Sequence, residues 1–214
     1  MRKWLVLAGL LGLLVLLLLA TSISFADDAA KSDFFNGKNL EGWEGLMDYW
    51  SVKDGAIVGS TPGDGIKFNT FLCSKKKYKD FELTFQVRLK DGRGNSGVQI
   101  RSRIFDRDHF AVAGPQADIG DQYWGSLYGE HDPGRMMKAA PVDVVKRVLK
   151  EADFNDYSIK CVGKHVTIKI NGETMVDDDF DKMPDEGIIA WQLHAGYPNM
   201  EVTFRNIEFK ELGK

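Results

Sequence analysis

Residues 81–89, FELTFQVRL, decide the fold class. Hydrophobic residues occupy every odd position of this stretch and polar residues every even position. As a strand, the segment would bury one face and expose the other, whereas a helix would scatter the same side chains around its axis. The segment therefore predicts a β-strand packed against a hydrophobic core.

The same alternation recurs on both sides of short turn signals. Residues 166–170 alternate and run into Asn171-Gly172, and Asp54-Gly55 separates two further apolar runs. Both dipeptides suit two-residue hairpins, because their residues tolerate positive φ. The alternation changes phase at Arg205-Asn206, which predicts a β-bulge. Only residues 142–150 have a helical pattern. We therefore expect one all-β sandwich of about ten to twelve strands.

The first 26 residues have the features of an export leader. Two basic residues precede an unbroken apolar run over residues 4–20, and Ser24-Phe25-Ala26 resembles a small-x-small cleavage site. We expect a cleaved signal peptide over residues 1–26, a loose segment over 27–32 and a periplasmic or secreted domain over 33–212. An uncleaved membrane anchor is the alternative, because about 20 apolar residues can span a bilayer.

Charge and cysteine content exclude several function classes. Without the leader, 188 residues carry 26 Lys and Arg against 31 Asp and Glu, a net charge of −5. Nucleic acids and anionic membranes both attract basic surfaces, so neither is an expected partner once the leader is removed. Cys73 and Cys161 are too few for a disulfide scaffold. We expect them to be buried in strands, with a single bridge as the alternative.

Polar residues spaced by two interrupt otherwise apolar strands, and residues of one parity share a face of a sheet. These groups are Gln192 with His194, Gln116 with Asp118, and Gln99 with Arg101 and Arg103. On one concave face they would suit a hydroxyl-rich ligand. We expect the first pair to be functional, whereas solvent exposure is the simpler interpretation of Gln99 and Arg103.

The run DDDFD at residues 177–181 offers several carboxylates, which Ca²⁺ prefers as ligands. However, the run lacks the spacing of an EF-hand loop and follows a predicted hairpin strand. We therefore expect a solvated turn rather than a calcium site.

Eight short motifs are distributed along nearly the whole of the chain after the leader. They are FFNGKNLEGW (34–43), YKDFEL (78–83), NSGVQIR (95–101), QADIG (116–120), WGSLYGE (124–130), NDY (155–157), QLH (192–194) and FRNI (204–207). Together they resemble the 3-keto-disaccharide hydrolase family, also described as the 3-keto-glucoside 1,2-lyase and 3-keto-2-hydroxyglucal hydratase domain. The resemblance covers residues 33–212. Two positions depart from the pattern of the family: Phe154 stands where the family commonly has Trp before Asn, and Pro115 stands where an aromatic residue often precedes the Gln.

The resemblance implies a concanavalin A-like jelly-roll β-sandwich of two antiparallel sheets. It also implies a substrate class, glycosides already oxidised to a ketone at sugar carbon 3. The ketone acidifies the hydrogen on C2, so a base can remove that hydrogen and the C1 substituent can leave; addition of water then completes hydrolysis. Such an elimination needs a base near C2, a donor or cation near the C3 oxygen and an acid at the leaving oxygen.

The roles follow as a hypothesis from this resemblance. His194 is the expected base, Arg101 or Gln192 steadies the enolate oxygen, and Asp118 or Glu130 acts on the leaving group. The expected sugar-binding residues are Gln116, Asn95, Trp124 and Tyr128, the last two as part of an aromatic platform. The cofactor stays open: one divalent metal could replace the cationic donor, with Asp118, Glu130 and His194 as first candidate ligands.

Three other functions remain as alternatives, because a fold alone does not fix a function. The first is a carbohydrate-binding module without catalysis, and the second is an ordinary secreted glycosidase with two facing carboxylates. The third is a structural envelope protein, which predicts no convergent polar site.

Overall fold

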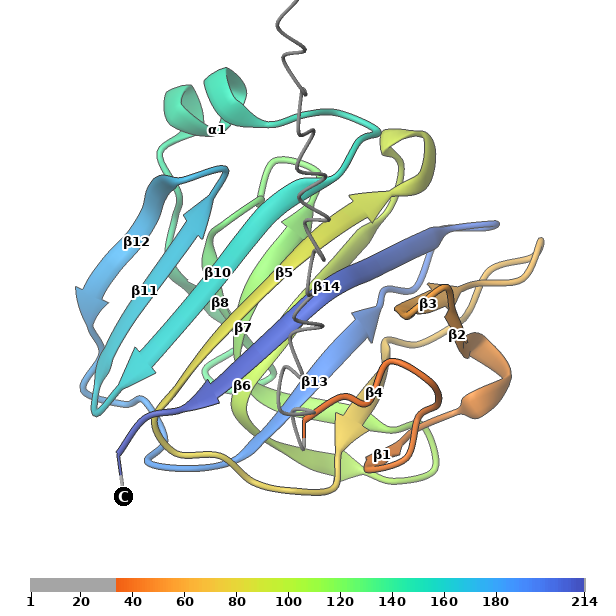
Figure 1. Ribbon diagram of the computed structural model, residues 1–214, viewed down its shortest axis with the longest axis horizontal. Helices are drawn as coiled ribbons and strands as arrows, with labels where there is room; N and C mark the ends of the chain where they lie inside the picture. The colour runs from red at the N-terminus through yellow and green to blue at the C-terminus, as the bar shows by residue number, and fades with distance from the viewer. Residues whose placement is uncertain (1–33, 214) are drawn as a thin grey trace, which may run out of the picture.

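The computed structural model describes residues 34–213, so the leader and the segment 27–32 lie outside the described residues. Two seven-stranded antiparallel sheets form a sandwich, with sheet B in front of sheet A in Figure 1. In spatial order, sheet A contains β1 (Trp43–Glu44), β4 (Thr70–Ser74), β13 (Ile188–Leu193), β6 (Asn95–Asp106), β7 (Ala111–Gly120), β8 (Leu127–Glu130) and β9 (Arg135–Lys138). Sheet B contains β12 (Glu173–Asp179), β11 (His165–Ile170), β10 (Asn155–Val162), β5 (Phe81–Leu89), β14 (Glu201–Glu211), β3 (Ala56–Ser60) and β2 (Trp50–Lys53).

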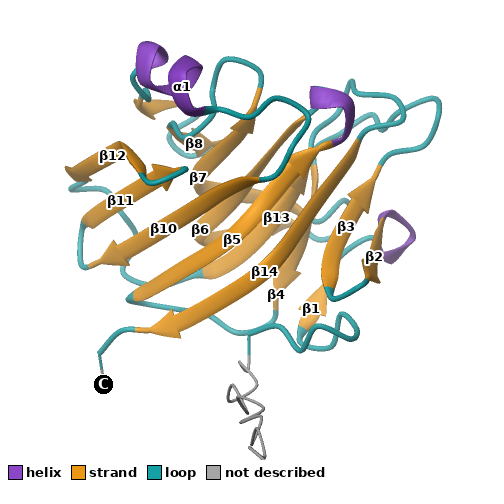
Figure 2. Ribbon diagram, turned by 45° about the horizontal axis from the view of Figure 1, so that its top comes forward, coloured by secondary structure: helices purple, strands orange, loops and turns teal. Residues whose placement is uncertain are grey.

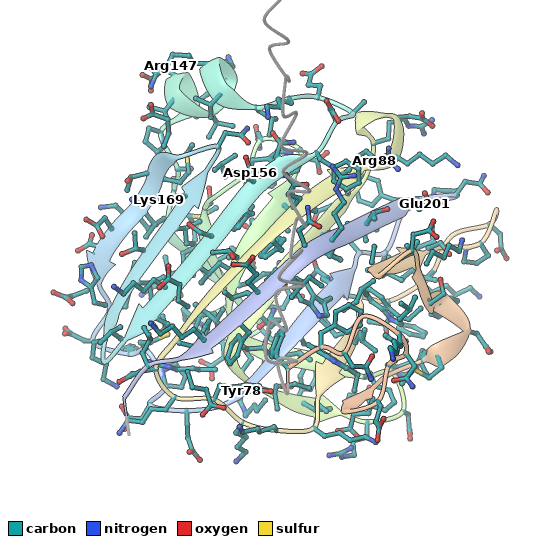
Figure 3. All side chains as sticks on the ribbon, viewed as in Figure 1. Tyr78, Arg88, Arg147, Asp156, Lys169 and Glu201 are labelled. Atoms are coloured by element: carbon teal, nitrogen blue, oxygen red, sulfur yellow. The ribbon has the colours of Figure 1, made fainter. Side chains whose placement is uncertain are left out.

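The all-β sandwich predicted from sequence is confirmed, but the predicted strand number is too low. Residues 34–213 form 14 strands. The additional ones include two-residue β1 and the short edge strand β9, which are too brief or too polar to alternate detectably. Helix α1 (Val142–Val148) lies at one end of the sandwich in Figure 2, and 3-10 turns cover Met47–Tyr49 and Lys90–Gly92. No helix in this described part of the chain is long and apolar enough to cross a membrane.

The core lies between the inner faces of the two sheets. Strand β5 has the bounds predicted from its alternation, and all five of its odd-numbered side chains are buried. Across the interface, the Phe85 ring contacts the Trp191 ring edge-to-face at a centroid distance of 5.3 Å. Phe204 contacts the same Trp191 at 4.4 Å. Each such buried side chain contributes about 1.5–3 kcal/mol of hydrophobic stabilisation, so these contacts hold the sheets face to face.

The predicted turns are confirmed by their backbone angles. Asn171 and Gly172 have φ values of 50° and 86° and connect β11 to β12. Asp54-Gly55 connects β2 to β3 in the same way. The register of β14 against β5 shifts between Arg205 and Glu208, where Asn206 has a φ of 51°. The phase change in the sequence therefore marks a bulge, as expected.

Sheet A bends sharply within the β6–β7 hairpin. The register shifts between Gln99 and Arg103, and Arg101 has a φ of 48°. Beyond this bulge, the hairpin packs on the outer side of β4 and β13. A second, small hydrophobic cluster forms there from Phe71, Cys73, Val112, Ile188 and Ala190. Part of the outer face of sheet A is thus covered by its own hairpin.

The outer face of sheet B is polar and exposed. Figure 3 shows Asp156 and Lys169 on its strands β10 and β11, and both side chains are exposed. The acidic run begins in edge strand β12 rather than in a turn, which corrects the predicted conformation while its exposure agrees with the prediction. Asp177 and Asp179 accept hydrogen bonds from the ring of His165 at 3.0 Å each. The acidic run is therefore part of a cluster of ion pairs on the protein surface.

Candidate functional site

Polar side chains gather on the outer face of sheet A, which is turned away from the viewer in Figure 1. Gln99 pairs with Gln116 across β6 and β7, and Gln116 pairs with Tyr128 on β8. Residues paired directly across strands share a face, so these three side chains project together. Asp118 lies two residues beyond Gln116 on the same face, and Gln192 reaches the group from β13.

The sheet curves around this group. Asn69 immediately precedes β4 and Glu130 ends β8, and three strands lie between β4 and β8. A flat sheet would separate the two residues by roughly 19 Å. Instead, the Asn69 Nδ2 donates to Glu130 Oε1 at 3.0 Å. The outer face of sheet A is therefore concave, and this hydrogen bond crosses it.

A continuous chain of buried hydrogen bonds lies beneath. Ser102 donates from Oγ to Gln99 Oε1 at 2.7 Å, and Gln99 Nε2 donates to Gln116 Oε1 at 2.9 Å. Gln116 Nε2 donates to Asp118 Oδ1 at 2.9 Å and to Gln192 Oε1 at 3.3 Å. The Nε2 of Gln192 is buried and has no hydrogen-bond partner. Every amide of the chain is thus paired except the last donor, at Gln192.

Asp118 is the carboxyl group best suited to proton transfer here. Burial raises the pKa of Asp118 to about 7, with a further increase from nearby Glu130, while the hydrogen bond from Gln116 acts in the opposite direction. From the core side, the Tyr157 hydroxyl donates to the backbone carbonyl of Asp118 at 3.0 Å. A carboxyl group with this pKa carries its proton for part of the time at neutral pH, which suits general acid–base catalysis.

His194 stands just after β13, two residues from Gln192, and is half-buried. Its Nδ1 lies 2.6 Å from the Ala195 carbonyl oxygen. Since a carbonyl only accepts hydrogen bonds, Nδ1 must carry a proton, and in the neutral ring Nε2 holds the lone pair. Asn69 connects the His194 segment to the Asn69–Glu130 hydrogen bond, because its Oδ1 accepts a hydrogen bond from the Ala195 backbone amide at 2.9 Å.

The rest of the edge of the concave face combines residues from two loops with residues of β6 and β8. The Tyr197 ring contacts the His194 ring at 5.6 Å, and its hydroxyl donates to Asp121 Oδ2 at 2.5 Å. Asn95, predicted as a sugar-binding residue, donates to the same carboxylate at 3.3 Å. Tyr128 forms the other side, where burial and the charges of Glu130 and Asp118 raise its pKa. The structure thus brings Asn95, Tyr128, Glu130 and His194 around one concave face.

Arg101 does not belong to this group, which corrects its predicted substrate-binding role. Its guanidinium donates to the carbonyl oxygens of Lys79, Gly163 and Pro184 and to the Asp80 carboxylate at 2.7 Å. The side chain is 1% exposed. Its positive φ breaks the alternation of β6, so parity counted through this position gives the wrong face.

Two further expectations about single residues are wrong. Trp124 belongs to the main hydrophobic core rather than to an aromatic platform, because its side chain is buried between the sheets. Gln99 is fully buried rather than solvent-facing. Arg103, by contrast, is exposed and forms a surface ion pair with Asp132 at 3.0 Å, as predicted.

The candidate metal ligands do not form a ready site. Within residues 34–213, no group of three or more His, Cys, Asp or Glu side chains is arranged to hold a metal ion. One oxygen of Asp118 accepts a hydrogen bond from Gln116, and one oxygen of Glu130 accepts a hydrogen bond from Asn69. The donor set proposed from sequence therefore does not fit a three-ligand metal site, and no catalytic step is assigned to one.

A cavity of about 1010 Å³ lies elsewhere on sheet A. Its lining comes from the bent β6–β7 hairpin, the β8–β9 turn and the loop before β13, and includes Arg103, Arg107, Asp132 and Asp181. It contains none of Asp118, Gln192 or His194, although Ser102 borders it. The charged residues at this cavity are largely exposed, whereas the buried polar chain lies at the concave site.

Sequence reasoning missed three residues of the site, Ser102, Asn69 and Tyr197. Ser102 lies beyond the Arg101 bulge, where parity fails. Asn69 and Tyr197 lie in loops outside any alternating pattern. The only available signal for them was their proximity in sequence to β4 and to His194.

A curved antiparallel sandwich with a polar concave face defines the class of galectin-like and concanavalin A-like folds. Solved structures agree. A candidate glycosyl hydrolase from Parabacteroides distasonis ATCC 8503 matches with 20% identity and a TM-score of 0.60, over 84% of this chain and 93% of that chain. A galectin-like protein of unknown function from Bacillus subtilis matches with 12% identity and a TM-score of 0.59, over 80% and 90%. The B. subtilis carbohydrate-binding module CBM66 matches with 16% identity and a TM-score of 0.56, over 79% and 96%.

The amino-acid sequence assigns the protein to a narrower group than the fold does, namely to a single family. Residues 30–210 match the family described as 3-keto-alpha-glucoside-1,2-lyase-like domain, and the chain belongs to this family. No curated protein matches it. Membership supports a carbohydrate-related function for the chain.

Proposed function

We propose that this protein cleaves glycosides oxidised to a ketone at carbon 3, by elimination across C1 and C2 followed by hydration. The observation that carries the proposal is the pairing, through Gln116, of a buried carboxyl group that retains a proton near neutral pH with an unpartnered amide donor. Family membership supports a sugar ligand. The leader predicted over residues 1–26 supports an exported enzyme, periplasmic or secreted.

His194 is the proposed base. Its Nε2 lone pair removes the proton from C2, and the electrons of that C–H bond move toward the C3 carbonyl to form an enolate. The hydrogen bond from Nδ1 to the Ala195 carbonyl fixes the ring and stabilises the imidazolium that forms. Tyr197 packs against the ring and limits its rotation.

Gln192 is the proposed donor to the enolate oxygen. Its Nε2 is enclosed and unpaired, which costs about 1–3 kcal/mol in the free protein. An oxygen that gains negative charge during the reaction would recover this energy in a site from which water is excluded. The Asn69–Glu130 hydrogen bond crosses the concave face, and we propose that its opening admits the sugar.

Asp118 is the proposed acid for the leaving oxygen. Because Oδ1 accepts from Gln116, the proton resides on Oδ2, away from the amide chain. When the enolate collapses, the C1–O bond breaks, a C1–C2 double bond forms and Asp118 protonates the departing oxygen. Water then adds its oxygen to C1 and a proton to C2. Glu130, Asn95 and Tyr128 border the ring-binding space.

Incubation of the purified protein with 3-keto-trehalose or 3-keto-lactose in D₂O tests the proposal. We expect release of the free sugar and deuterium at C2 of the oxidised product, since elimination replaces the original C2 hydrogen. The product alone in D₂O measures uncatalysed exchange. Release from unoxidised trehalose or lactose would instead indicate an ordinary glycosidase, and binding without release would indicate a carbohydrate-binding module.

Histidine variants test the base. His194→Gln should reduce turnover by about 10²–10⁴-fold. His165→Gln provides a matched control, because His165 lies on sheet B and its ring contacts only surface carboxylates. Wild-type turnover in the His194→Gln variant would refute the assignment of the base.

A further inference from the structure

The buried hydrogen-bond chain has a direction. The Asp118 Oδ1 is an acceptor whether the carboxyl group is ionised or carries its proton on Oδ2, so the Gln116 amide turns its Nε2 toward this oxygen. The Oε1 of Gln116 then faces Gln99 and requires a donor, which is the Gln99 Nε2. The Oε1 of Gln99 in turn faces the Ser102 hydroxyl. With Asp118 Oδ1 as the acceptor, these amide orientations pair every side chain from Ser102 to Asp118.

The direction of these hydrogen bonds also determines whether Gln192, the last residue of the hydrogen-bond chain, has a free donor or a free acceptor. Gln116 Nε2 donates both to Asp118 and to Gln192 Oε1. With its oxygen thus occupied, Gln192 must turn Nε2 away from the chain. That nitrogen is buried, unpartnered and able only to donate. The site consequently presents a donor, rather than an acceptor, at this position.

We propose that Gln99 and Ser102 are positioning residues that hold the Gln116 amide in the orientation that both Asp118 and Gln192 require. The inference rests on the proposed function for its catalytic consequence. Gln99 donates to Gln116 and Ser102 donates to Gln99, so both are proposed to act through Gln116 rather than on the sugar. A Gln116 amide without its donor from Gln99 could rotate, which would place its oxygen against the Asp118 carboxylate.

Gln99→Met tests this proposal, because methionine has a similar volume and cannot donate to Gln116. The hydrogen bond from Gln116 favours ionised Asp118, and its weakening should raise the Asp118 pKa by roughly half a unit or more. Glu130, Tyr128 and Tyr157 are the other titratable groups near Asp118, and none of them is altered. The carboxyl ¹³C shift of Asp118, followed by NMR against pH, measures this without any substrate.

Turnover provides a second readout. In Gln99→Met, kcat for a 3-keto-disaccharide should fall by about tenfold or more, with KM changing less than kcat. Gln99→Glu should restore turnover only while the new carboxyl group is protonated and able to donate to Gln116, so its advantage over Gln99→Met should disappear as pH rises. Gln86→Met is the control, since Gln86 also forms side-chain hydrogen bonds but lies on sheet B.

Ser102→Ala removes only the hydroxyl group that begins the hydrogen-bond chain. It tests the same proposal if the Gln99→Met variant does not fold. It should change the Asp118 pKa and kcat in the same directions by smaller amounts. An unchanged Asp118 pKa in either folded variant overturns the proposal. If the wild type shows no turnover while the Asp118 pKa responds as expected, the proposed reaction fails and the positioning role stands.

Discussion

The side chain of Gln116 lies directly over the backbone of Gly97 on the neighbouring strand. A Cβ atom added at Gly97 would lie 2.5 Å from Gln116 Cδ and 2.7 Å from its Nε2. Real Cβ atoms do not approach other atoms so closely, so glycine provides the space in which the amide reaches both Asp118 and Gln192. The requirement is steric and does not depend on an unusual φ.

Gly97→Ala should therefore displace Gln116 and reduce turnover by about tenfold or more, at a cost in stability of about 1–3 kcal/mol. Chemical denaturation and steady-state kinetics measure the two effects. Gly63→Ala is a suitable control, because its added Cβ would meet only the Asn199 side chain at 3.5 Å. Retention of wild-type kinetics in Gly97→Ala would show that the Gln116 position is not critical.

Asp118→Asn should separate stability from activity. The folded-state pKa of about 7 lies above the ordinary value of 3.8 for this carboxyl group, so the folded protein binds more protons than the unfolded chain between these two pH values. Asp118 therefore lowers stability progressively as pH rises through this interval. The variant should match the wild type near pH 4 and exceed it near pH 8, by up to about 4 kcal/mol.

Thermal unfolding across this pH range measures the difference, and turnover of the variant should fall by about 10²–10⁴-fold. A stability difference that stays constant with pH would contradict the raised pKa. The asparagine side chain introduced by this substitution can still accept a hydrogen bond from Gln116, so the two proteins differ in charge but not in this hydrogen bond.

Arg101→Met should impair folding rather than chemistry. The guanidinium is buried and ties the Asp80 carboxylate to three backbone carbonyls, so its removal should cost about 3–5 kcal/mol. Arg103→Met, which removes an exposed ion pair, should cost less than about 1 kcal/mol. Urea denaturation compares them. A stable Arg101→Met protein with a specific loss of kcat would restore the catalytic role predicted from sequence.

Cys73 and Cys161 should be inert in the folded protein. Both thiols are free and buried, and burial raises the pKa of Cys161 to about 11 and that of Cys73 further. A thiolate-specific reagent such as Ellman's reagent should react with neither until the protein unfolds. Reducing agent should leave the melting temperature unchanged, whereas a decrease would indicate a bridge.

The fold could be predicted from sequence because its signals are local. The alternation of residues 81–89 and the Asn171-Gly172 turn each depend on neighbouring residues alone. The site was predicted in part: parity correctly placed Gln116, Asp118 and Gln192 on one face. Parity failed at Arg101, where one left-handed residue shifts the count, and it could not detect Asn69, whose role arises from curvature of the whole sheet.

The hydrogen bond from Tyr157 to the Asp118 carbonyl joins the two layers at strand β7. Tyr157 belongs to sheet B, whose outer face contributes nothing to the site, yet its hydroxyl holds the backbone of Asp118 from behind. The distance between the layers therefore influences where the carboxyl group stands. Substitutions deep in the opposite sheet can consequently shift the position of Asp118 without touching the concave face, which gives protein engineering a second, remote place from which to act on this carboxyl group.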